Sequence, residues 1–225
     1  MGIKLVIFDF DGTIADTLPD IVASVNIFLE KYGDKRAGEA LIRRSIGNGA
    51  RKLIERTMAG LDIPGELSEE ELSRYKKIYS ENGTRYSKAY PCTTDTLKDI
   101  KRRGIHIAMA TMKPQAVTKK ALAAIGADCY FDLVFSAEQM EKPKPDPWVV
   151  RACAERFGVS TAETMMVGDG MTDVRAGRDA GAVAVAVLGG YYDTESLLRS
   201  DADYKIESIG ELPGILDKEN GKCLK

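Results

Sequence analysis

The chain has 225 residues, of which 44% are hydrophobic and 29% charged, and 32 basic against 34 acidic side chains give a net charge of −2. This composition is typical of a globular protein with one large domain or two smaller ones and a substantial core. The charge balance argues against proteins that coat nucleic acids or bind membrane surfaces, and no apolar run has the length of a membrane span or signal peptide.

The four cysteines are scattered without the CxxC spacing of a zinc or redox site: Cys92, Cys129, Cys153 and Cys223. Such scattered thiols are typical of reduced cysteines and not of a disulfide framework. We therefore expect a cytoplasmic protein without nucleic-acid or membrane partners. The choice between a monomer and a homodimer stays open.

A short apolar run at residues 3–8 leads into the stretch "FDFDGTIADT", residues 8–17. The run predicts a buried strand. A spacing of two places Asp9 and Asp11 on one side if the extended geometry persists, and Gly12 allows a sharp turn after them. Carboxylates are costly to bring out of water without partners, so their position at the end of a buried strand requires an explanation.

No strand-like run occurs between residues 15 and 90, where helical patterns follow one another directly. Helices are predicted over residues 18–33, 50–60 and 68–83, the last with Ser68 as its N-cap before a run of glutamates. We expect residues 15–90 to form an all-helical cap inserted after the first strand. It would lie over the carboxyl ends of the sheet, where open α/β sheets bind ligands.

From residue 91 onward, apolar strands alternate with helices that close on glycine. The strands are predicted at 105–111, 133–137, 164–169 and 182–188, and the helices at 94–104, 115–126, 147–158 and 172–181. This alternation predicts an α/β fold with a Rossmann-like parallel sheet covered on both faces. Residues 1–14 and 91–225 would form this core, and residues 15–90 the helical cap.

Four groups of polar residues fall at or just after predicted strand ends. After the Asp9 and Asp11 pair come Thr111, the proline-stiffened loop "EKPKPDP" at 141–147, and "VGDGMTD", which carries Asp169 and Asp173. Oxygen ligands favour a hard cation such as Mg²⁺, and a cation with a lysine would attract a phosphate dianion. Each group alone has an ordinary alternative, such as a turn or a solvated lysine. The four together favour a catalytic site.

These four groups resemble the four motifs of the haloacid dehalogenase superfamily, and the helical insert resembles the cap of its phosphoglycolate phosphatase-like branch. The resemblance implies that Asp9 is the nucleophile and that Asp11 is the general acid and base. Thr111 and Lys142 would hold the phosphoryl oxygens. The implied Mg²⁺ ligands are Asp9, Asp11 (through its backbone carbonyl), Asp169 and Asp173.

Two details of the motifs leave a choice. Lys142 and Lys144 both precede a proline, and matching to "KPxPDP" favours Lys142 as the inward lysine, which leaves Lys144 solvated. The superfamily's second motif has asparagine after the hydroxyl residue, whereas Met112 follows Thr111 here. A backbone N–H at Met112 would then replace the asparagine. We also expect Gly12, Thr13 and Met112 to contact the substrate.

The cap contains the stretch "SIGNGARKLIER", residues 45–56, in which Gly47 and Gly49 flank Asn48. It is either an ordinary glycine turn with a solvated basic face or a substrate loop. In the second interpretation Asn48 contacts the substrate and Arg51 binds an anionic leaving group. The stretch resembles the "GNG" segment of phosphoglycolate phosphatases, which favours a small acidic phosphomonoester as substrate.

The sequence therefore predicts a Mg²⁺-dependent phosphomonoester hydrolase with a phosphoaspartyl intermediate, acting on a small phosphorylated metabolite such as 2-phosphoglycolate. The alternatives are a sugar-phosphate mutase, a pyrophosphatase or nucleotidase of the same superfamily, and a non-catalytic phosphate-binding module. Thr13 argues against the mutase, because related mutases often have valine at that position. Met112 is the only sequence support for the binding module.

Overall fold

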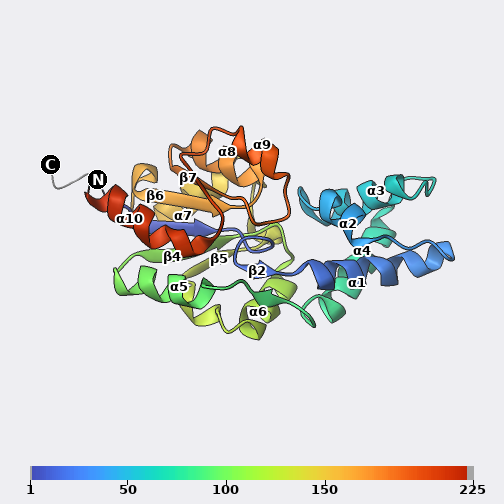
Figure 1. The fold of residues 1–225 in the computed structure, drawn as a ribbon. Helices are drawn as coiled ribbons and strands as arrows, with labels where there is room; N and C mark the ends of the chain where they lie inside the picture. Colours follow the sequence, from blue (N-terminus) through green and yellow to red (C-terminus); the bar gives the residue numbers. More distant parts are fainter. Residues whose placement is uncertain (1, 222–225) are drawn as a thin grey trace.

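The protein is built around a six-stranded parallel sheet with the strand order β5-β4-β1-β6-β7-β8. The computed structural model describes residues 2–221. The strands are β1 (Leu5–Phe8), β4 (His106–Ala110), β5 (Leu133–Phe135), β6 (Thr164–Gly168), β7 (Val183–Val187) and β8 (Tyr204–Ile206). Helices pack on the sheet, and the helices between residues 18 and 82 lie beyond one end of it (Figure 1). The predicted α/β class with a helical cap is confirmed.

Both faces of the sheet are covered, which explains why its strands are apolar throughout. Val6 and Phe8 of β1 lie in a buried cluster with side chains of α5 (Thr93–Arg102), α6 (Gln115–Ala124) and α10 (Leu212–Gly221). Leu5 and Ile7 belong to a second cluster with α7 (Trp148–Phe157) and α8 (Met171–Ala180). Successive side chains of a strand point to opposite faces, so two covered faces require an unbroken apolar run.

Several predicted helix ends are confirmed in detail. Gly158 and Gly181 end α7 and α8 in the left-handed conformation, with φ of 65° and 78°, as expected of glycine at that position. Ser68 accepts a hydrogen bond from the Glu71 N–H and forms a capping box with it. The helix expected to reach Gly33 instead stops at Leu29, and a 3₁₀ turn continues the chain to Tyr32.

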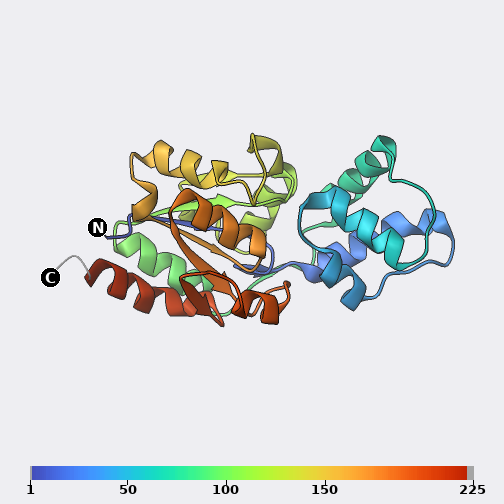
Figure 2. The same cartoon turned by 90° about the horizontal axis from the view of Figure 1, so that it is seen from above.

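The four cap helices have a hydrophobic core of their own. They are α1 (Leu18–Leu29), α2 (Glu39–Ser45), α3 (Gly49–Gly60) and α4 (Glu69–Asn82). The buried side chains include Val25, Phe28, Ile42, Ile54 and Tyr75. Figure 2 shows this body set apart from the sheet and joined to it by narrow connections. We propose residues 15–90 as the cap domain, as the sequence predicts.

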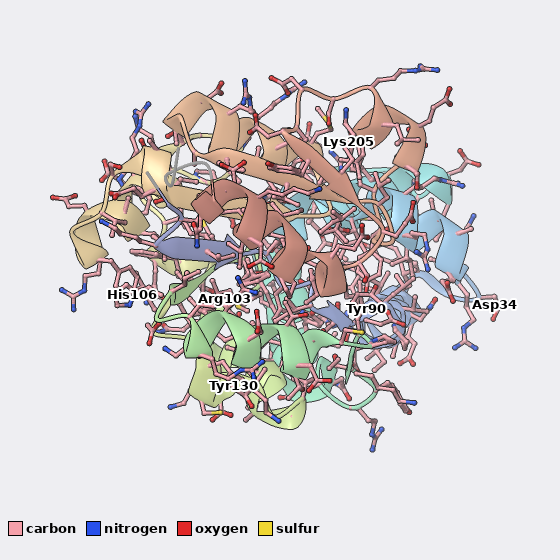
Figure 3. The ribbon with its side chains drawn as sticks, turned by 60° about the vertical axis from the view of Figure 1, so that its left-hand side comes forward. Asp34, Tyr90, Arg103, His106, Tyr130 and Lys205 are labelled. Carbon is pink, nitrogen blue, oxygen red and sulfur yellow. The ribbon has the colours of Figure 1, made fainter. Side chains whose placement is uncertain are left out.

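The two connections between cap and core run side by side. β2 (Ala15–Asp16) and β3 (Lys88–Ala89) pair antiparallel, with Ala15 opposite Ala89 and Asp16 opposite Lys88. The Tyr90 N–H then donates to the Ile14 carbonyl at 3.0 Å, and Figure 3 shows Tyr90 beside this ribbon. The chain therefore leaves the core and returns to it at one place.

Some elements were not predicted from the sequence: α2, β8, α9 (Thr194–Leu198), α10 and short 3₁₀ turns at 128–130, 137–139, 161–163 and 209–211. β8 has three residues, and α9 has five, which is too short for periodicity to identify an element. β8 extends the sheet beyond β7 in parallel. These elements lengthen the core without changing its class.

Cys92, Cys129 and Cys153 are free thiols, as expected, and Cys223 lies outside the described residues. Within residues 2–221, none of the helices combines the length and the apolar character needed to cross a membrane.

Asp20 is fully buried in α1 and holds the return segment of the cap. Its carboxylate accepts hydrogen bonds from the N–H groups of Arg85, Tyr86 and Ser87 and from the Ser87 hydroxyl, at 2.6–2.9 Å. Replacing Asp20 by Ala leaves three backbone donors without this acceptor, and each such loss costs about 1–3 kcal/mol. We expect Asp20→Ala to lower the free energy of unfolding by about 3 kcal/mol or more in urea titrations.

The matched control is Ser87→Ala, which removes one hydroxyl donor and leaves the carboxylate in place. Its expected cost is about 1 kcal/mol. Equal losses in the two variants would show that the return segment does not depend on Asp20.

Candidate active site

The predicted site residues meet at the carboxyl edge of the sheet, because β4, β1 and β6 are neighbours there. Thr111 follows β4, Asp9 follows β1 and Asp169 follows β6. The Asp9 N–H donates to the Val167 carbonyl at 2.9 Å, which continues the sheet pattern past the last residue of β1. Parallel strands thus bring side chains far apart in the sequence to one edge.

A cleft of about 860 Å³ opens at this edge between core and cap. The core contributes Asp9, Asp11, Thr111, Lys144, Asp169 and Asp173. The cap contributes side chains from α1 to α4, among them Arg43, Arg44, Asn48, Arg56, Tyr75 and Tyr79. The expected position of the cap over the carboxyl ends of the strands is therefore confirmed, and a ligand in the cleft would contact both bodies.

Three of the carboxylates form a compact group. Asp9, Asp169 and Asp173 each place one oxygen within 4.8 Å of the others. Asp169 approaches the first motif so closely that a Cβ at Gly12 would lie 2.2 Å from its Oδ2, and Gly12 has a φ of +80°. Glycine at position 12 therefore satisfies two requirements, a left-handed turn and room for the Asp169 carboxylate.

Hydrogen bonds fix the Asp169 carboxylate on both sides. The Tyr191 N–H donates to Asp169 Oδ2 at 2.6 Å, and the Thr13 hydroxyl lies 3.3 Å from Oδ1. The Tyr191 hydroxyl accepts from the N–H groups of Thr17 and Leu18 at 2.6 and 2.9 Å. Tyr191, which the sequence analysis did not identify, therefore connects the carboxylate group with the start of the first cap helix.

Burial and mutual repulsion raise the pKa values of two of these carboxylates, Asp9 and Asp169. Burial raises the pKa of Asp9 to about 7, with the charges of Asp173 and Asp11 adding to it and that of Lys144 opposing it. The pKa of Asp169 is likewise raised by burial and by the charge of Asp9. The carboxylates therefore lack sufficient positive charge around them.

This donor set fits a divalent cation. The core residues that line the cleft include five carboxylates (Asp9, Asp11, Asp169, Asp173 and Asp193) and two ammonium groups (Lys113 and Lys144), so five formal negative and two positive charges leave an excess of three negative charges. Carboxylate oxygens are the ligands that hard divalent ions prefer. Of the predicted metal ligands, Asp9, Asp169 and Asp173 form the group, and the Asp11 side chain lies outside it.

Lys144 is the inward lysine of the proline loop, and the prediction of Lys142 is wrong. Lys144 is 2% exposed, and its Nζ lies 2.6 Å from Asp173 Oδ1, 3.2 Å from Asp9 Oδ1 and 2.7 Å from the Ala110 carbonyl. Lys142 is exposed. Motif spacing alone cannot distinguish two Lys-Pro pairs, whereas the turn between Pro143 and Asp146 directs Lys144 toward the strands.

The ion pairs of Lys144 decide its charge state. Burial alone would lower its pKa, but the charges of Asp173 and Asp9 outweigh burial and raise the pKa above its usual value. Lys144 therefore stays protonated and presents a fixed cation between two carboxylates. A fixed cation at this position can also attract phosphoryl oxygens.

Asp11 lies at the start of the cap connection with a different set of partners. Its Oδ1 accepts hydrogen bonds from the Thr17 hydroxyl at 2.5 Å and from Lys113 Nζ at 2.7 Å. Lys113 was not singled out from the sequence, although it stands two residues after Thr111. A lysine following an apolar strand end so closely is the one signal that could have identified it.

Thr111 and Met112 lie where the sequence placed them, in the wall of the cleft. Thr111 is 1% exposed, and its hydroxyl accepts a hydrogen bond from the Lys113 N–H at 3.2 Å. Met112 is half-buried, and its side chain reaches toward the cap. A Cβ built at Gly49 of the cap would lie 3.5 Å from the Met112 Cε. The residue that departs from the family's second motif thus lies opposite the cap loop.

The cap loop itself was only partly predicted. Asn48 lines the cleft in the left-handed conformation, with φ of 62°. Arg51 does not line the cleft, and its expected role toward the leaving group is wrong. It donates to the Leu67 carbonyl at 2.8 Å and to Glu69 Oε1 at 2.6 Å. Arg51 lies in the first turn of α3, and its side chain faces residues 67–69. The glycine-turn pattern of the sequence does not show this direction.

Three other arginines of the cap line the cleft. Arg43 donates to the Gly190 carbonyl at 3.5 Å and lies over the Tyr191 ring. Arg56 donates to the carbonyls of residues 45–47 and to Asn48 Oδ1. Arg44 is exposed, and within residues 2–221 it has no hydrogen-bond or ion-pair partner. The cap thus faces the core carboxylates with positive charge.

Comparisons with known proteins agree with this site. The family model of haloacid dehalogenase-like hydrolases matches residues 6–187. The chain belongs to this family. A phosphoglycolate phosphatase of Nitrosospira multiformis is 32% identical over 224 residues, covering 98% of each chain. One of Neisseria meningitidis is 32% identical over 218 residues, covering 96% of this chain and 93% of its own.

The fold of this hydrolase also matches a crystal structure, that of a predicted phosphoglycolate phosphatase from Haemophilus somnus. The TM-score is 0.87 at 30% identity, and the match covers 95% of this chain and 97% of the other. These comparisons confirm the predictions of a haloacid dehalogenase superfamily member and of a phosphatase. Phosphatases of this superfamily generally depend on a metal ion, which the group of Asp9, Asp169 and Asp173 can hold.

The two lysines of the proline loop give a matched test of the site. We expect Lys144→Met to lower the rate of phosphate release by at least about 10²-fold, because the variant loses a fixed cation at the reacting group. Lys142→Met removes the same charge from an exposed position two residues away, so its rate should stay within about twofold of wild type. Initial rates of both variants check this, and a larger loss in Lys142→Met would restore the original assignment.

Cation binding should depend on pH with a defined sign. Because the pKa of Asp9 is raised to about 7 from the usual 3.8, the metal-free fold loses stability as pH rises through this window. A cation that needs the ionised carboxylates must displace a proton at low pH. We expect Mg²⁺ to raise the melting temperature more at pH 8 than at pH 5.5, as measured by thermal unfolding with and without EDTA.

Asp169→Asn is the control for this measurement, since it removes one carboxylate of the group. Its melting temperature should respond weakly to Mg²⁺ at both pH values. A shift in wild type that is equal at pH 5.5 and pH 8 would contradict the assignment of the cation to these carboxylates.

Proposed function

We propose that this hydrolase is a Mg²⁺-dependent phosphomonoesterase that forms a phosphoaspartyl intermediate on Asp9. The observation that carries the proposal is the position of the Asp9 carboxylate, which lies in the cleft among Asp169, Asp173 and Lys144. Its Oδ1 accepts a hydrogen bond from the Phe10 N–H at 2.7 Å, so its orientation is fixed. A fixed carboxylate beside a fixed cation suits in-line attack on phosphorus.

In the first step an Asp9 oxygen forms a bond to phosphorus while the bond to the ester oxygen breaks. Asp11 donates its proton to that oxygen, and the alcohol leaves. In the second step Asp11 takes a proton from water, the water oxygen attacks phosphorus, and the bond to Asp9 breaks. Lys144 and the Thr111 hydroxyl would contact the phosphoryl oxygens in both steps.

Mg²⁺ held by Asp9, Asp169 and Asp173, with the Asp11 carbonyl as a further ligand, would neutralise the negative charge of the phosphoryl group. The chain's own contribution is the orientation of these ligands. The Gly170 N–H donates to Asp173 Oδ2 at 3.0 Å, and Tyr191 and Thr13 hold Asp169. Thr13 thus supports a metal ligand, in addition to its expected position beside the substrate.

We propose a small acid such as 2-phosphoglycolate as the substrate. The proposal rests on the cap arginines that face the core across the cleft and on the names of the similar phosphatases. Arg44 is the arginine we assign to the substrate carboxylate, because it lines the cleft and is exposed. Asn48, Gly12 and Met112 stay as proposed contacts in the same cleft. A cytoplasmic location and a monomer or homodimer also stay predictions.

The experiment is a measurement of initial rates of phosphate release with and without Mg²⁺. The substrates are 2-phosphoglycolate, ethyl phosphate, sugar phosphates, nucleotides and pyrophosphate. We expect Mg²⁺-dependent hydrolysis with a preference for 2-phosphoglycolate.

Asp9→Asn should lose turnover without unfolding, with mass spectrometry confirming that the amide has not reverted to a carboxylate. Turnover by that amide form would contradict the nucleophile, and no release from any ester would favour the mutase or the binding module.

The substrate assignment has its own matched pair of variants. Ethyl phosphate resembles 2-phosphoglycolate without the carboxylate. A charge-assisted hydrogen bond contributes about 1.5–3 kcal/mol, so Arg44→Ala should raise KM for 2-phosphoglycolate by about tenfold or more and leave KM for ethyl phosphate nearly unchanged. Arg51→Ala is the control, because Arg51 pairs with Glu69. An effect in Arg51→Ala alone would return the role to Arg51.

A further inference from the structure

Lys113 is a second buried lysine at the active site, and the mechanism above gives it no role. Its side chain is fully buried, with 0% exposed. It stands in the loop after β4, between Met112 and the start of α6. Taking an ammonium group out of water costs several kcal/mol unless partners compensate for it. The partners of Lys113 should therefore show why a lysine occupies this position.

These partners come from both bodies of the protein. Lys113 Nζ lies 2.7 Å from Asp11 Oδ1 in the core and forms a hydrogen bond with the Tyr79 hydroxyl of cap helix α4. It also lies over the rings of Tyr79 and Phe10, at 4.7 and 5.5 Å from their centroids. Aromatic faces attract a buried cation. The ammonium group is thus enclosed by one carboxylate and two aromatic rings, one of which also contributes its hydroxyl.

Tyr79 is itself held in place within the cap. It is 5% exposed and stacks on Tyr75 of the same helix, with centroids 5.9 Å apart and the planes inclined by 7°. Both tyrosines line the cleft. The position of Lys113 is therefore set by a rigid part of the cap, although Lys113 belongs to the core.

The two buried lysines contact different carboxylates. Lys144 contacts Asp9 and Asp173, whereas Lys113 contacts Asp11. A proton donor must point at the departing oxygen, and a carboxylate can rotate about its side-chain torsions unless one oxygen is held. Lys113 and the Thr17 hydroxyl both hold Oδ1 of Asp11, and Lys113 does so as a cation. This pair of contacts restricts the direction in which the other oxygen faces.

We propose that Lys113 is a positioning residue that orients the Asp11 carboxylate for proton transfer, and that Tyr79 of the cap holds Lys113 in place. The inference rests on the proposed function, in which Asp11 is the acid that protonates the leaving alcohol. The inference adds that the orientation of the Asp11 carboxylate depends on the cap, through Tyr79 and Lys113. When α4 lies against the core, as here, the acid is held in one orientation.

The experiment compares two esters that differ in their need for a proton. 2-Phosphoglycolate releases an aliphatic alkoxide, which must be protonated, whereas p-nitrophenyl phosphate releases an acidic phenol that departs as the anion. Proton transfer typically contributes about 10²–10⁴-fold to a rate. We expect Lys113→Met to lower kcat/KM for 2-phosphoglycolate by at least about tenfold and for p-nitrophenyl phosphate by less than about threefold. A structural defect would lower both values equally.

Tyr79→Phe gives a second test that keeps the shape of the cap. It removes the hydroxyl that holds Lys113 and should shift the ratio of the two kcat/KM values in the same direction, by a smaller factor. Lys120→Met is the control. Lys120 donates to the Ser80 carbonyl of the cap, so this variant removes a different lysine contact between core and cap. Its ratio should equal that of wild type.

The outcomes separate the inference from the proposed function. If wild type hydrolyses both esters and Lys113→Met and Tyr79→Phe lower both rates equally, the role of Lys113 is overturned and the proposed function stands. If only Lys113→Met fails to fold, the Tyr79→Phe ratio decides. If wild type hydrolyses neither ester, the proposed function fails and the role of Lys113 fails with it.

Discussion

The repulsion among carboxylates at the strand ends, two of them buried (Asp169 and Asp173) and two half-buried (Asp9 and Asp11), is the interaction on which the rest of the site depends. Carboxylates this close stay ionised only if positive charge is brought to them, and burial raises the pKa of Asp9 to about 7 even though the charge of Lys144 opposes the shift. The core supplies two ammonium groups, Lys113 and Lys144, and leaves room for a divalent cation. The excess of negative charge thus favours a bound cation, and the proposed phosphoryl group would contact that cation and the lysines.

The parallel sheet makes this concentration of charge possible. Neighbouring strands end at the same edge, so carboxylates, a hydroxyl and a lysine from distant segments meet without long loops. The apolar strands behind them keep the site rigid, since both faces of the sheet are packed. The cap then closes the charged edge from the other side. In the proposed function, the phosphoryl dianion would lie between these rigid carboxylates and a separate helical body.

The sequence predicted the elements whose patterns are local. Alternating apolar strands and glycine-closed helices gave the core, and motif order gave Asp9, Asp11, Thr111, Asp169 and Asp173. The incorrect predictions, those for Lys142 and Arg51, concern the direction in which a side chain points.

The two lysines of the "KPKPDP" loop carry the same local signal, and only the turn that follows selects Lys144. Arg51 carries the charge expected of a substrate contact, but the packing of α3 directs it to Glu69. The roles of Lys113 and Tyr191 were not predicted because they depend on partners more than 100 residues away, or across the cleft. Tertiary packing decides such cases, and a single sequence does not contain that information locally.

The paired connections between the two bodies have a consequence for how the protein is assembled. Because β2 and β3 pair residue by residue, the ends of the helical insert meet at one short ladder. In topological terms, β2 and β3 form an antiparallel hairpin, and the whole cap is the loop that connects its two strands. The entropy of closing a loop grows only with the logarithm of its length, so a long insert costs little more than a short one once the ladder forms. The catalytic sheet can therefore carry caps of different sizes at this position, and the four strand ends that hold the chemistry need not move.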